Sequence, residues 1–127
     1  MTEPALLLDS NVVVWLDQKP QRIPTSVLLR LESAPLVYLS AVTAWELAIK
    51  QSLGALALIR PVSDLILTHR MTELPVTIRH GEAVQNLPYH HRDPFDRLLI
   101  AQAMVEGLIL VTGDKQLLSY GVPILLV

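Results

Sequence analysis

Short runs of consecutive apolar residues alternate along the chain with longer segments in which apolar residues recur every three or four positions. The short runs lie at 5–8, 36–39, 108–112 and 122–127 and do not alternate between apolar and polar residues. Such runs are typical of strands that are buried on both faces, as in parallel sheets. The longer segments have the spacing of amphipathic helices. The pattern therefore predicts an α/β fold, with a central, mainly parallel sheet flanked by helices.

Capping residues set the bounds of the predicted helices. Ser40 is a good N-cap for a helix over 41–53, and Gly54 suits its carboxyl end. The pair Asp93-Pro94 predicts another helix start, with a carboxylate at the N-cap and proline in the first turn. The other predicted elements are a helix over 94–106, a helix over 11–17 capped by Ser10, helices over 25–33, 80–86 and 115–119, a helix from 61 or 63 to about 73, and an extended segment at 76–78.

The composition narrows the class of protein. A chain of 127 residues with 51% hydrophobic and 17% charged residues predicts one folded domain over 1–127 and excludes a disordered tail. The absence of cysteine excludes disulfide scaffolds, zinc ribbons and cysteine nucleophiles. The first residues lack the pattern of a signal peptide, and no apolar run approaches the roughly 20 residues of a membrane span. We therefore expect a cytoplasmic protein that does not enter a membrane.

The charge balance restricts the ways in which nucleic acid could bind. Ten Lys and Arg residues against 12 Asp and Glu residues give a net charge of −2, so the surface is not generally basic. Contact with nucleic acid would have to be local or shared across an oligomer. The high apolar fraction predicts that part of the surface is covered, either in a homodimer or under a partner.

Four acidic residues stand near the predicted strand ends and helix starts. Asp9 directly follows the first strand, and Asp114 follows the strand over 108–112. Glu46 and Asp96 lie in the early turns of two helices. Because ligands of parallel sheets bind at the carboxyl ends of the strands, these acids are expected to converge there. Carboxylate oxygens are suitable ligands for Mg²⁺ or Mn²⁺, and a bound cation could activate water against a phosphodiester.

Each of these acids also has a purely local interpretation. Asp9 and Asp114 could be turn residues, and Glu46 could pair with Lys50 one helical turn later. Asp96 could interact only with the helix dipole, and Asp93 is favoured as a plain N-cap.

Two histidines and two tryptophans also have both a functional and a structural interpretation. Adjacent histidines rarely face the same way, so His90 and His91 favour surface or RNA contact over a metal pair. Trp15 and Trp45 are predicted in the core rather than as stacking platforms. No P-loop, dinucleotide-binding glycine motif or nucleophile elbow occurs in the chain.

Taken together, four segments resemble the PIN-domain ribonucleases, and specifically the VapC-type toxins of bacterial toxin–antitoxin pairs. The most specific segment is D-P-F-D-R-L-L-I-A-Q-A, and the resemblance covers nearly the whole chain. It implies a three-layer PIN fold. The segments are LLLDSNVVVWL at 6–16, SAVTAWELAIK at 40–50, HHRDPFDRLLIAQA at 90–103 and LVTGD at 110–114.

The resemblance also implies a site and a mechanism. Asp9 and Asp96 would hold Mg²⁺ or Mn²⁺ most directly, while Glu46 and Asp114 would complete the shell or orient the attacking water. Asp93 would be auxiliary. The family's reaction is in-line attack of metal-activated water on an RNA phosphate.

The implied binding partners are RNA, an antitoxin and a second copy of the chain. The antitoxin would lay an apolar helix on the toxin and place a basic side chain in the acidic pocket. Gly113 stands where the family often has a bulkier or basic residue, and it would loosen the loop that carries Asp114. The residues predicted to contact RNA are Asn11, Lys50, Arg92, Arg97 and Lys115.

Three other interpretations remain open at this stage. A haloacid-dehalogenase-like phosphohydrolase requires a second acid where Asn11 stands, and a receiver domain requires an acidic pair near the first strand. Both features are missing here, which disfavours these two classes. A degenerate PIN domain that only binds RNA or a partner is the third alternative, and the presence of all four acids disfavours it.

Overall fold

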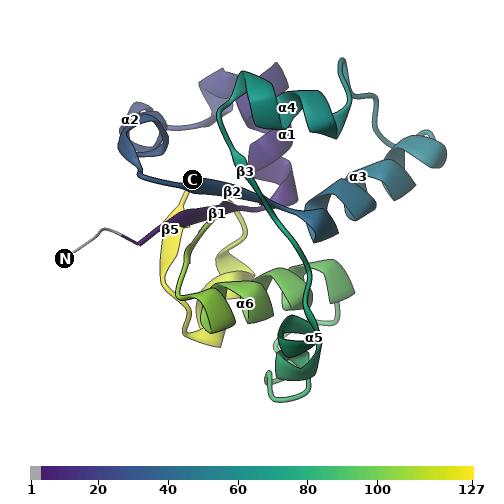
Figure 1. Cartoon of the computed structure of the whole chain (residues 1–127), viewed down its shortest axis with the longest axis vertical. Helices are drawn as coiled ribbons and strands as arrows, with labels where there is room; N and C mark the ends of the chain where they lie inside the picture. The colour runs from purple at the N-terminus through teal and green to yellow at the C-terminus, as the bar shows by residue number, and fades with distance from the viewer. Residues whose placement is uncertain (1–3) are drawn as a thin grey trace.

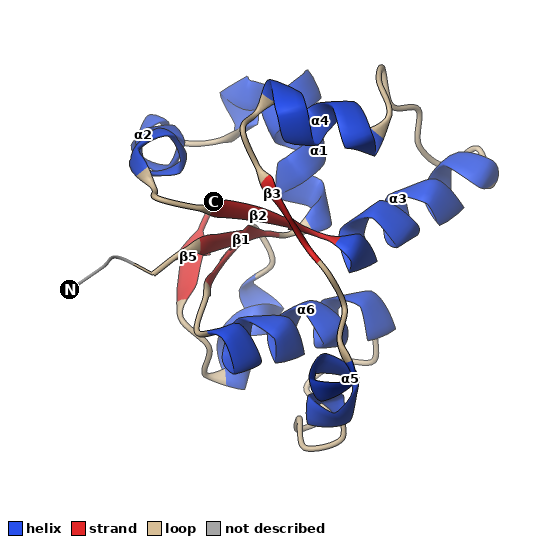
Figure 2. Ribbon diagram, viewed as in Figure 1, coloured by secondary structure: helices blue, strands red, loops and turns tan. Residues whose placement is uncertain are grey.

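A five-stranded parallel sheet forms the centre of the molecule (Figure 2). The computed structural model describes residues 4–127, so residues 1–3, in the segment interpreted above as lacking a signal peptide, lie outside it. The strands are ordered β3-β2-β1-β4-β5, and every neighbouring pair is parallel. The predicted sheet is thus confirmed. The strands are β1 (Leu6–Leu8), β2 (Val37–Ser40), β3 (Thr72–Leu74), β4 (Ile109–Thr112) and β5 (Ile124–Leu126).

Helices cover both faces of this sheet (Figure 1). The helices α1, α2 and α4 lie on one face, and α5 and α6 lie on the other; α3 extends from the end of β2 and contributes Leu47 to the first core and Val42 to the second. The three predicted layers are therefore present. The helices are α1 (Ser10–Gln18), α2 (Thr25–Ser33), α3 (Ala41–Ser52), α4 (Val62–Thr68), α5 (Ile78–Val84) and α6 (Pro94–Glu106), with short 3-10 helices η1 (Pro20–Arg22) and η2 (Lys115–Tyr120).

The strand β1 explains why the apolar runs do not alternate. Leu6 and Leu8 pack into the core under α1, α2 and α4, whereas Leu7 packs into the core on the α6 side. All three side chains are at most 1% exposed. Because both faces of the strand are covered, both sets of side chains must be apolar.

A network of hydrogen bonds fixes the start of α3, as the predicted Ser40 cap requires. The Ser40 hydroxyl oxygen accepts from the Val42 amide at 3.0 Å. The same hydroxyl donates to the Gln102 side chain of α6 at 2.5 Å. Since Gln102 is fully buried, this bond ties the two helices together through the sheet edge. Gly54 follows the helix with a positive φ of 73°, as predicted for its carboxyl end.

The segment between α4 and α5 differs from the prediction. The helix ends at Thr68 rather than near 73, because Arg70 takes a left-handed conformation with φ of 54° and turns the chain. Residues 72–74 then form the edge strand β3 beside β2, which the sequence did not predict. The predicted extended segment at 76–78 is the connection into α5, whose N-cap is Thr77.

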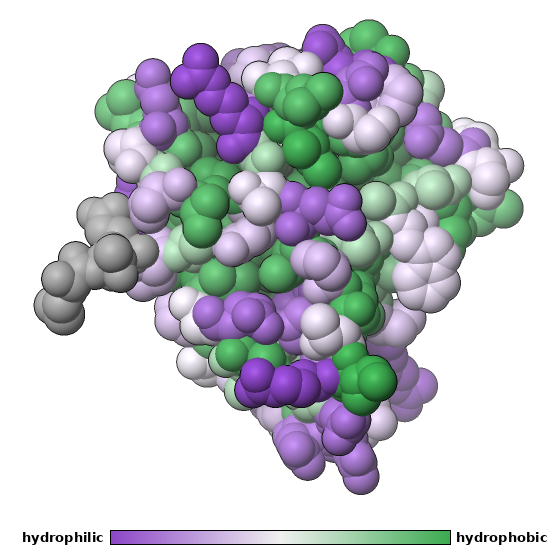
Figure 3. Space-filling view, in the orientation of Figure 1, coloured by the Kyte–Doolittle hydropathy of each residue, from purple (hydrophilic) through white to green (hydrophobic). Residues whose placement is uncertain are grey.

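The surface over α3 and α4 carries exposed apolar side chains. Trp45 is 60% exposed, so its prediction as a core residue is wrong, whereas Trp15 is half-buried. Leu67 on α4 and Ile59 before it are 80% and 76% exposed. Hydrophobic side chains gather over α4 in the upper part of Figure 3. Within residues 4–127, no helix combines the length and apolar character that crossing a membrane requires.

Candidate active site

The strand β1 lies where the topology of the sheet changes direction. Its neighbours are β2, which follows it in the chain, and β4, which is reached only after α6. In open parallel sheets, the carboxyl ends of two such strands border a crevice where ligands bind. Asp9 follows β1 and Thr112 ends β4, so both lie at this edge.

Asp9 is anchored between β1 and β4. Its amide donates to the Val111 carbonyl at 2.9 Å, and its Oδ2 accepts from the Thr112 hydroxyl at 2.6 Å. The residue is the N-cap of α1 and is 5% exposed. Burial raises the pKa of its carboxyl; the Thr112 hydrogen bond opposes this shift. A buried carboxylate held in this way is costly unless it has a partner.

Glu46 meets Asp9 from α3. Its Oε1 accepts from the Ser10 hydroxyl at 2.6 Å, and its Oε2 pairs with Lys50 Nζ at 2.9 Å. The two interpretations of Glu46 are therefore compatible, because the ion pair with Lys50 forms within the cluster. Ser10 was predicted as the cap of the first helix, but Asp9 is the cap. The Ser10 hydroxyl instead orients Glu46 across 36 residues of sequence.

At the start of α6, Asp93 caps the helix and Asp96 belongs to the acidic cluster. Asp93 Oδ1 accepts from the amides of Phe95 and Asp96, at 2.9 and 3.2 Å, and so is the predicted N-cap. Burial, and then the charge of neighbouring carboxylates, raise the pKa of Asp96 from 3.8 to about 7. All four predicted acids thus converge at one place. The neighbours that raise this pKa are, in decreasing order of effect, Asp9, Asp93, Glu46 and Asp114.

Asp114 completes the cluster from the segment after β4. Its amide donates to the Thr112 hydroxyl at 3.0 Å, and its Oδ1 accepts from the Gln116 amide at 2.9 Å. Thr112 therefore links Asp9 to Asp114. Sequence reasoning gave Thr112 no role; its position at the end of a buried strand, two residues before an acid, was the available signal.

Gly113 lies close to the ring of Trp15. A Cβ at this position would lie 3.3 Å from two carbons of the Trp15 ring. The backbone therefore packs closely against α1, and glycine permits the approach. The loop that carries Asp114 is held by this contact and by Thr112.

His91 is the site residue that sequence reasoning undervalued. Its Nε2 lies 3.7 Å from Asp96 Oδ2. One ligand atom each from His91, Asp96 and Asp114 lies within 4.8 Å of the other two. The pair His90-His91 was interpreted mainly as surface, and indeed only one of the two faces the acids.

The residues predicted to contact RNA separate into two groups. Four of them are on the surface or at the rim of the cluster, namely Asn11, Lys50, Arg92 and Lys115. Arg97 is different, since it is 5% exposed and donates to the carbonyls of Pro88, Leu87 and Val84 at 2.7 to 3.4 Å. Its guanidinium is occupied within the fold, so the prediction that it holds phosphate is wrong.

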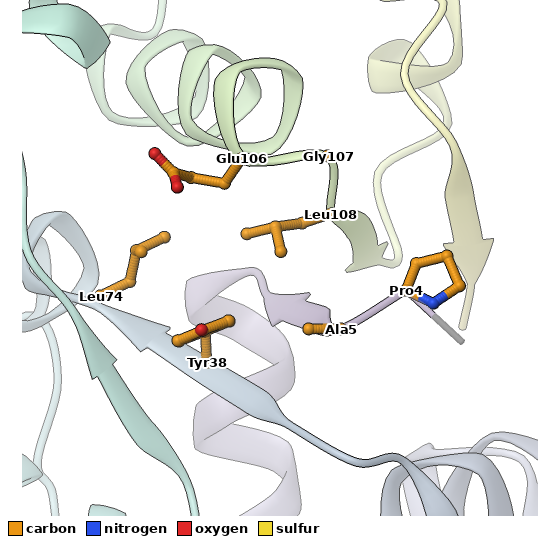
Figure 4. A pocket seen from close by; sticks show the side chains of 7 residues that line it. All are labelled: Pro4, Ala5, Tyr38, Leu74, Glu106, Gly107 and Leu108. Carbon is orange, nitrogen blue, oxygen red and sulfur yellow. The ribbon is translucent and has the colours of Figure 1, made fainter. Parts of the chain in front are cut away.

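A separate hollow lies at the opposite edge of the sheet (Figure 4). It measures about 400 Å³ and is bordered by Ala5 and Leu108, which precede β1 and β4. Tyr38, Leu74 and Glu106 also line it. None of the clustered acids does, so this hollow is not part of the candidate site.

The sequence matches the description PIN domain over residues 6–122. The chain belongs to the PIN-domain family. The resemblance of the four segments is therefore confirmed. This PIN domain is also 31% identical over 121 residues to Ribonuclease VapC22 of Mycobacterium tuberculosis (strain ATCC 25618 / H37Rv). The alignment covers 93% of each chain.

Solved structures share the fold of this PIN domain. VapBC2 from Rickettsia felis, bound to a DNA fragment from the promoter, matches with a TM-score of 0.71 at 14% identity, covering 95% of this chain and 97% of that one. VapBC-1 from nontypeable Haemophilus influenzae matches with a TM-score of 0.68 at 18% identity, covering 96% and 97%. At these identities the likeness concerns the fold alone.

The donor set of the site fits a divalent cation. Carboxylates from four elements lie close enough to repel one another, and this repulsion adds to burial, the larger cause, in raising the pKa of Asp96. The Nε2 atom of His91 is buried and has no hydrogen-bond partner among residues 4–127. Both features, excess negative charge and an unused nitrogen, are relieved by a bound cation.

Proposed function

We propose that this PIN domain, over the whole chain 1–127, is an Mg²⁺- or Mn²⁺-dependent endoribonuclease. The convergence of Asp9, Glu46, Asp96 and Asp114 at the switch point of the sheet carries this proposal. The relative named Ribonuclease VapC22 supports the substrate class. A cation bound there supplies positive charge beside the scissile phosphate and makes a nearby water more acidic.

The side chains of the site have different tasks in this proposal. Asp9 and Asp96 hold the cation most directly, and Glu46 and Asp114 complete its shell or orient the attacking water. The hydroxyls of Ser10 and Thr112 keep Glu46 and Asp9 in position, at 2.6 Å each. Asp93 stabilises the helix start that presents Asp96.

The rim supplies contacts to the RNA backbone. Lys50 remains 44% exposed while it pairs with Glu46, so its charge is available to a phosphate at the edge of the site. Asn11, Arg92 and Lys115 are exposed around the same edge. A homodimer that placed two such rims in one groove would offset the net charge of −2.

We further propose that the chain is the toxin of a toxin–antitoxin pair and acts in the cytoplasm. The structural neighbours titled VapBC support a protein antitoxin as the partner. Exposed apolar side chains on α3 and α4, such as Trp45 and Leu67, are candidates for cover by an apolar helix or a second copy.

Cleavage of labelled total RNA by the purified protein tests the enzyme. We expect discrete fragments with Mg²⁺ or Mn²⁺ and none with EDTA. Asp9→Asn should lower cleavage at least about a hundredfold, as removal of one charge-stabilising group does in an active site. The fold should persist, because the amide oxygen can still accept from Thr112.

Asp64→Asn is the matched control. Asp64 is exposed in the first turn of α4, outside the site, so this change should leave cleavage intact. Metal-independent cleavage, or full activity of Asp9→Asn, would overturn the assignment. A folded protein that binds RNA but never cuts it would be the degenerate binding module instead.

A further inference from the structure

The imidazole of His91 has one nitrogen bound to the fold and one directed at the acids. The Nδ1 atom lies 3.2 Å from the Tyr120 hydroxyl. The Nε2 atom faces Asp96 at 3.7 Å, beyond hydrogen-bond distance. No described residue satisfies this buried nitrogen. A buried polar atom without a hydrogen-bond partner either binds a ligand or lowers the stability of the fold.

The fold holds this ring in place. The His91 amide donates to the Tyr120 hydroxyl at 3.2 Å, and the two rings pack with their centroids 5.4 Å apart. Tyr120 is itself buried and accepts from Arg97 at 3.3 Å. The His91 side chain is 12% exposed as a result. These contacts hold the His91 ring against the buried Tyr120 side chain.

This arrangement is compatible with binding of a metal ion by the ring. Such residues use one ring nitrogen for the metal and the other for a hydrogen bond that fixes the ring. Here Tyr120 fixes Nδ1 and leaves Nε2 for the ligand position. A ligand role for Nε2 requires the tautomer with the proton on Nδ1, where the Tyr120 hydroxyl oxygen accepts it. In that tautomer the lone pair of Nε2 is free, and this atom lies within 4.8 Å of carboxylate oxygens of Asp96 and Asp114.

We propose that His91 Nε2 is a nitrogen ligand of the divalent cation, alongside carboxylate oxygens of Asp96 and Asp114. This inference rests on the proposed function and deepens it, because it predicts which cation the site prefers. Imidazole suits transition metals better than Mg²⁺, which favours oxygen ligands. The site should therefore select Mn²⁺ over Mg²⁺ more strongly than a purely carboxylate site does.

Electron spin-echo measurements on the full chain loaded with Mn²⁺ test the ligand directly. We expect ¹⁴N modulation from a coordinated imidazole, replaced by ¹⁵N modulation when the histidines are ¹⁵N-labelled. His91→Gln should abolish the nitrogen signal and weaken Mn²⁺ binding at least about tenfold. Mg²⁺ binding should fall less, so the ratio of the two affinities should narrow.

His90→Gln is the matched control. His90 is exposed and contacts the same tyrosine ring at 4.8 Å, but it offers no ligand atom to the acidic group. The nitrogen signal should survive this change. Because His69 and His80 are bound to Asp17 and Glu106, a surviving signal identifies His91 even if His91→Gln fails to fold.

The outcomes separate this inference from the proposed function. Bound Mn²⁺ without nitrogen modulation would overturn the His91 ligand and leave the metal-dependent nuclease standing. A nitrogen signal that disappears in His90→Gln would also overturn it. Failure of the wild-type protein to bind Mn²⁺ at all, by titration at millimolar concentration, would contradict the metal site itself.

Discussion

Asp96 combines burial with surrounding negative charge, and this combination makes stability depend on pH. Its pKa is raised from 3.8 to about 7, so the folded protein keeps a proton on this group that the unfolded chain has lost. Between these two values the native state binds more protons, and the free energy of unfolding falls as the pH rises. Asp9, whose pKa is raised as well, acts in the same direction.

We expect the metal-free protein to lose stability from about pH 4 to pH 7, and Asp96→Asn to remove most of that loss. The difference between the two proteins at pH 8 should be of the order of a few kcal/mol, since one pKa unit corresponds to about 1.4 kcal/mol. Thermal melts in EDTA at pH 5, 6, 7 and 8 measure it. A gap in Tm that does not widen with pH would contradict the raised pKa.

At the scale of elements, the start of α6 does two things at once. Asp93 and Pro94 begin the helix, as the sequence predicted, and Gly107 ends it. One turn into the helix, Arg97 reaches back to the carbonyl of Val84, which ends α5, and to those of Leu87 and Pro88 in the following loop. This buried guanidinium ties the loop that contains His91 to the helix that contains Asp96. A basic residue beside an acid in the sequence is thus a structural link here rather than a phosphate ligand.

Arg97→Met should destabilise the protein by about 3 kcal/mol, because it leaves buried carbonyls without donors. Arg92→Met is the control, since Arg92 is exposed and its loss should change stability by less than about 0.5 kcal/mol. Urea unfolding of both variants measures the difference. Equal stabilities would show that the hydrogen bonds of Arg97 contribute nothing net.

At the scale of the whole molecule, the acids come from four separate segments of the chain. Their mutual repulsion in the site lowers the stability of the metal-free fold. A cation that binds only the folded protein stabilises it by RT ln(1 + [L]/Kd), about 2.7 kcal/mol at a hundred times Kd. We therefore expect Mg²⁺ or Mn²⁺ at millimolar concentration to raise Tm. The shift should shrink in Asp9→Asn, as differential scanning fluorimetry can measure. An unchanged Tm in the wild-type protein would count against the site.

Local sequence signals predicted some helices and strands correctly and missed others. The helix over 94–106 has the predicted bounds, because its cap, its proline and its glycine act within the helix itself. The strand β3 was missed, because an edge strand of three residues has no apolar pattern and exists only through its pairing with β2. Trp45 was predicted in the core from residue type alone, and its exposure depends on what α3 packs against.

The sequence by itself determined the α/β class, the main helices and the four acids, since these depend on the order of residue types along the chain. Only the tertiary structure decided which side chains meet. The sheet order brings Thr112 onto Asp9 across 103 residues, and Ser10 onto Glu46 across 36. The packing of α6 and the loop before it also directs Arg97 inward and leaves His91 Nε2 facing Asp96. Side-chain direction depends on the packing of elements distant in sequence, which local spacing does not encode.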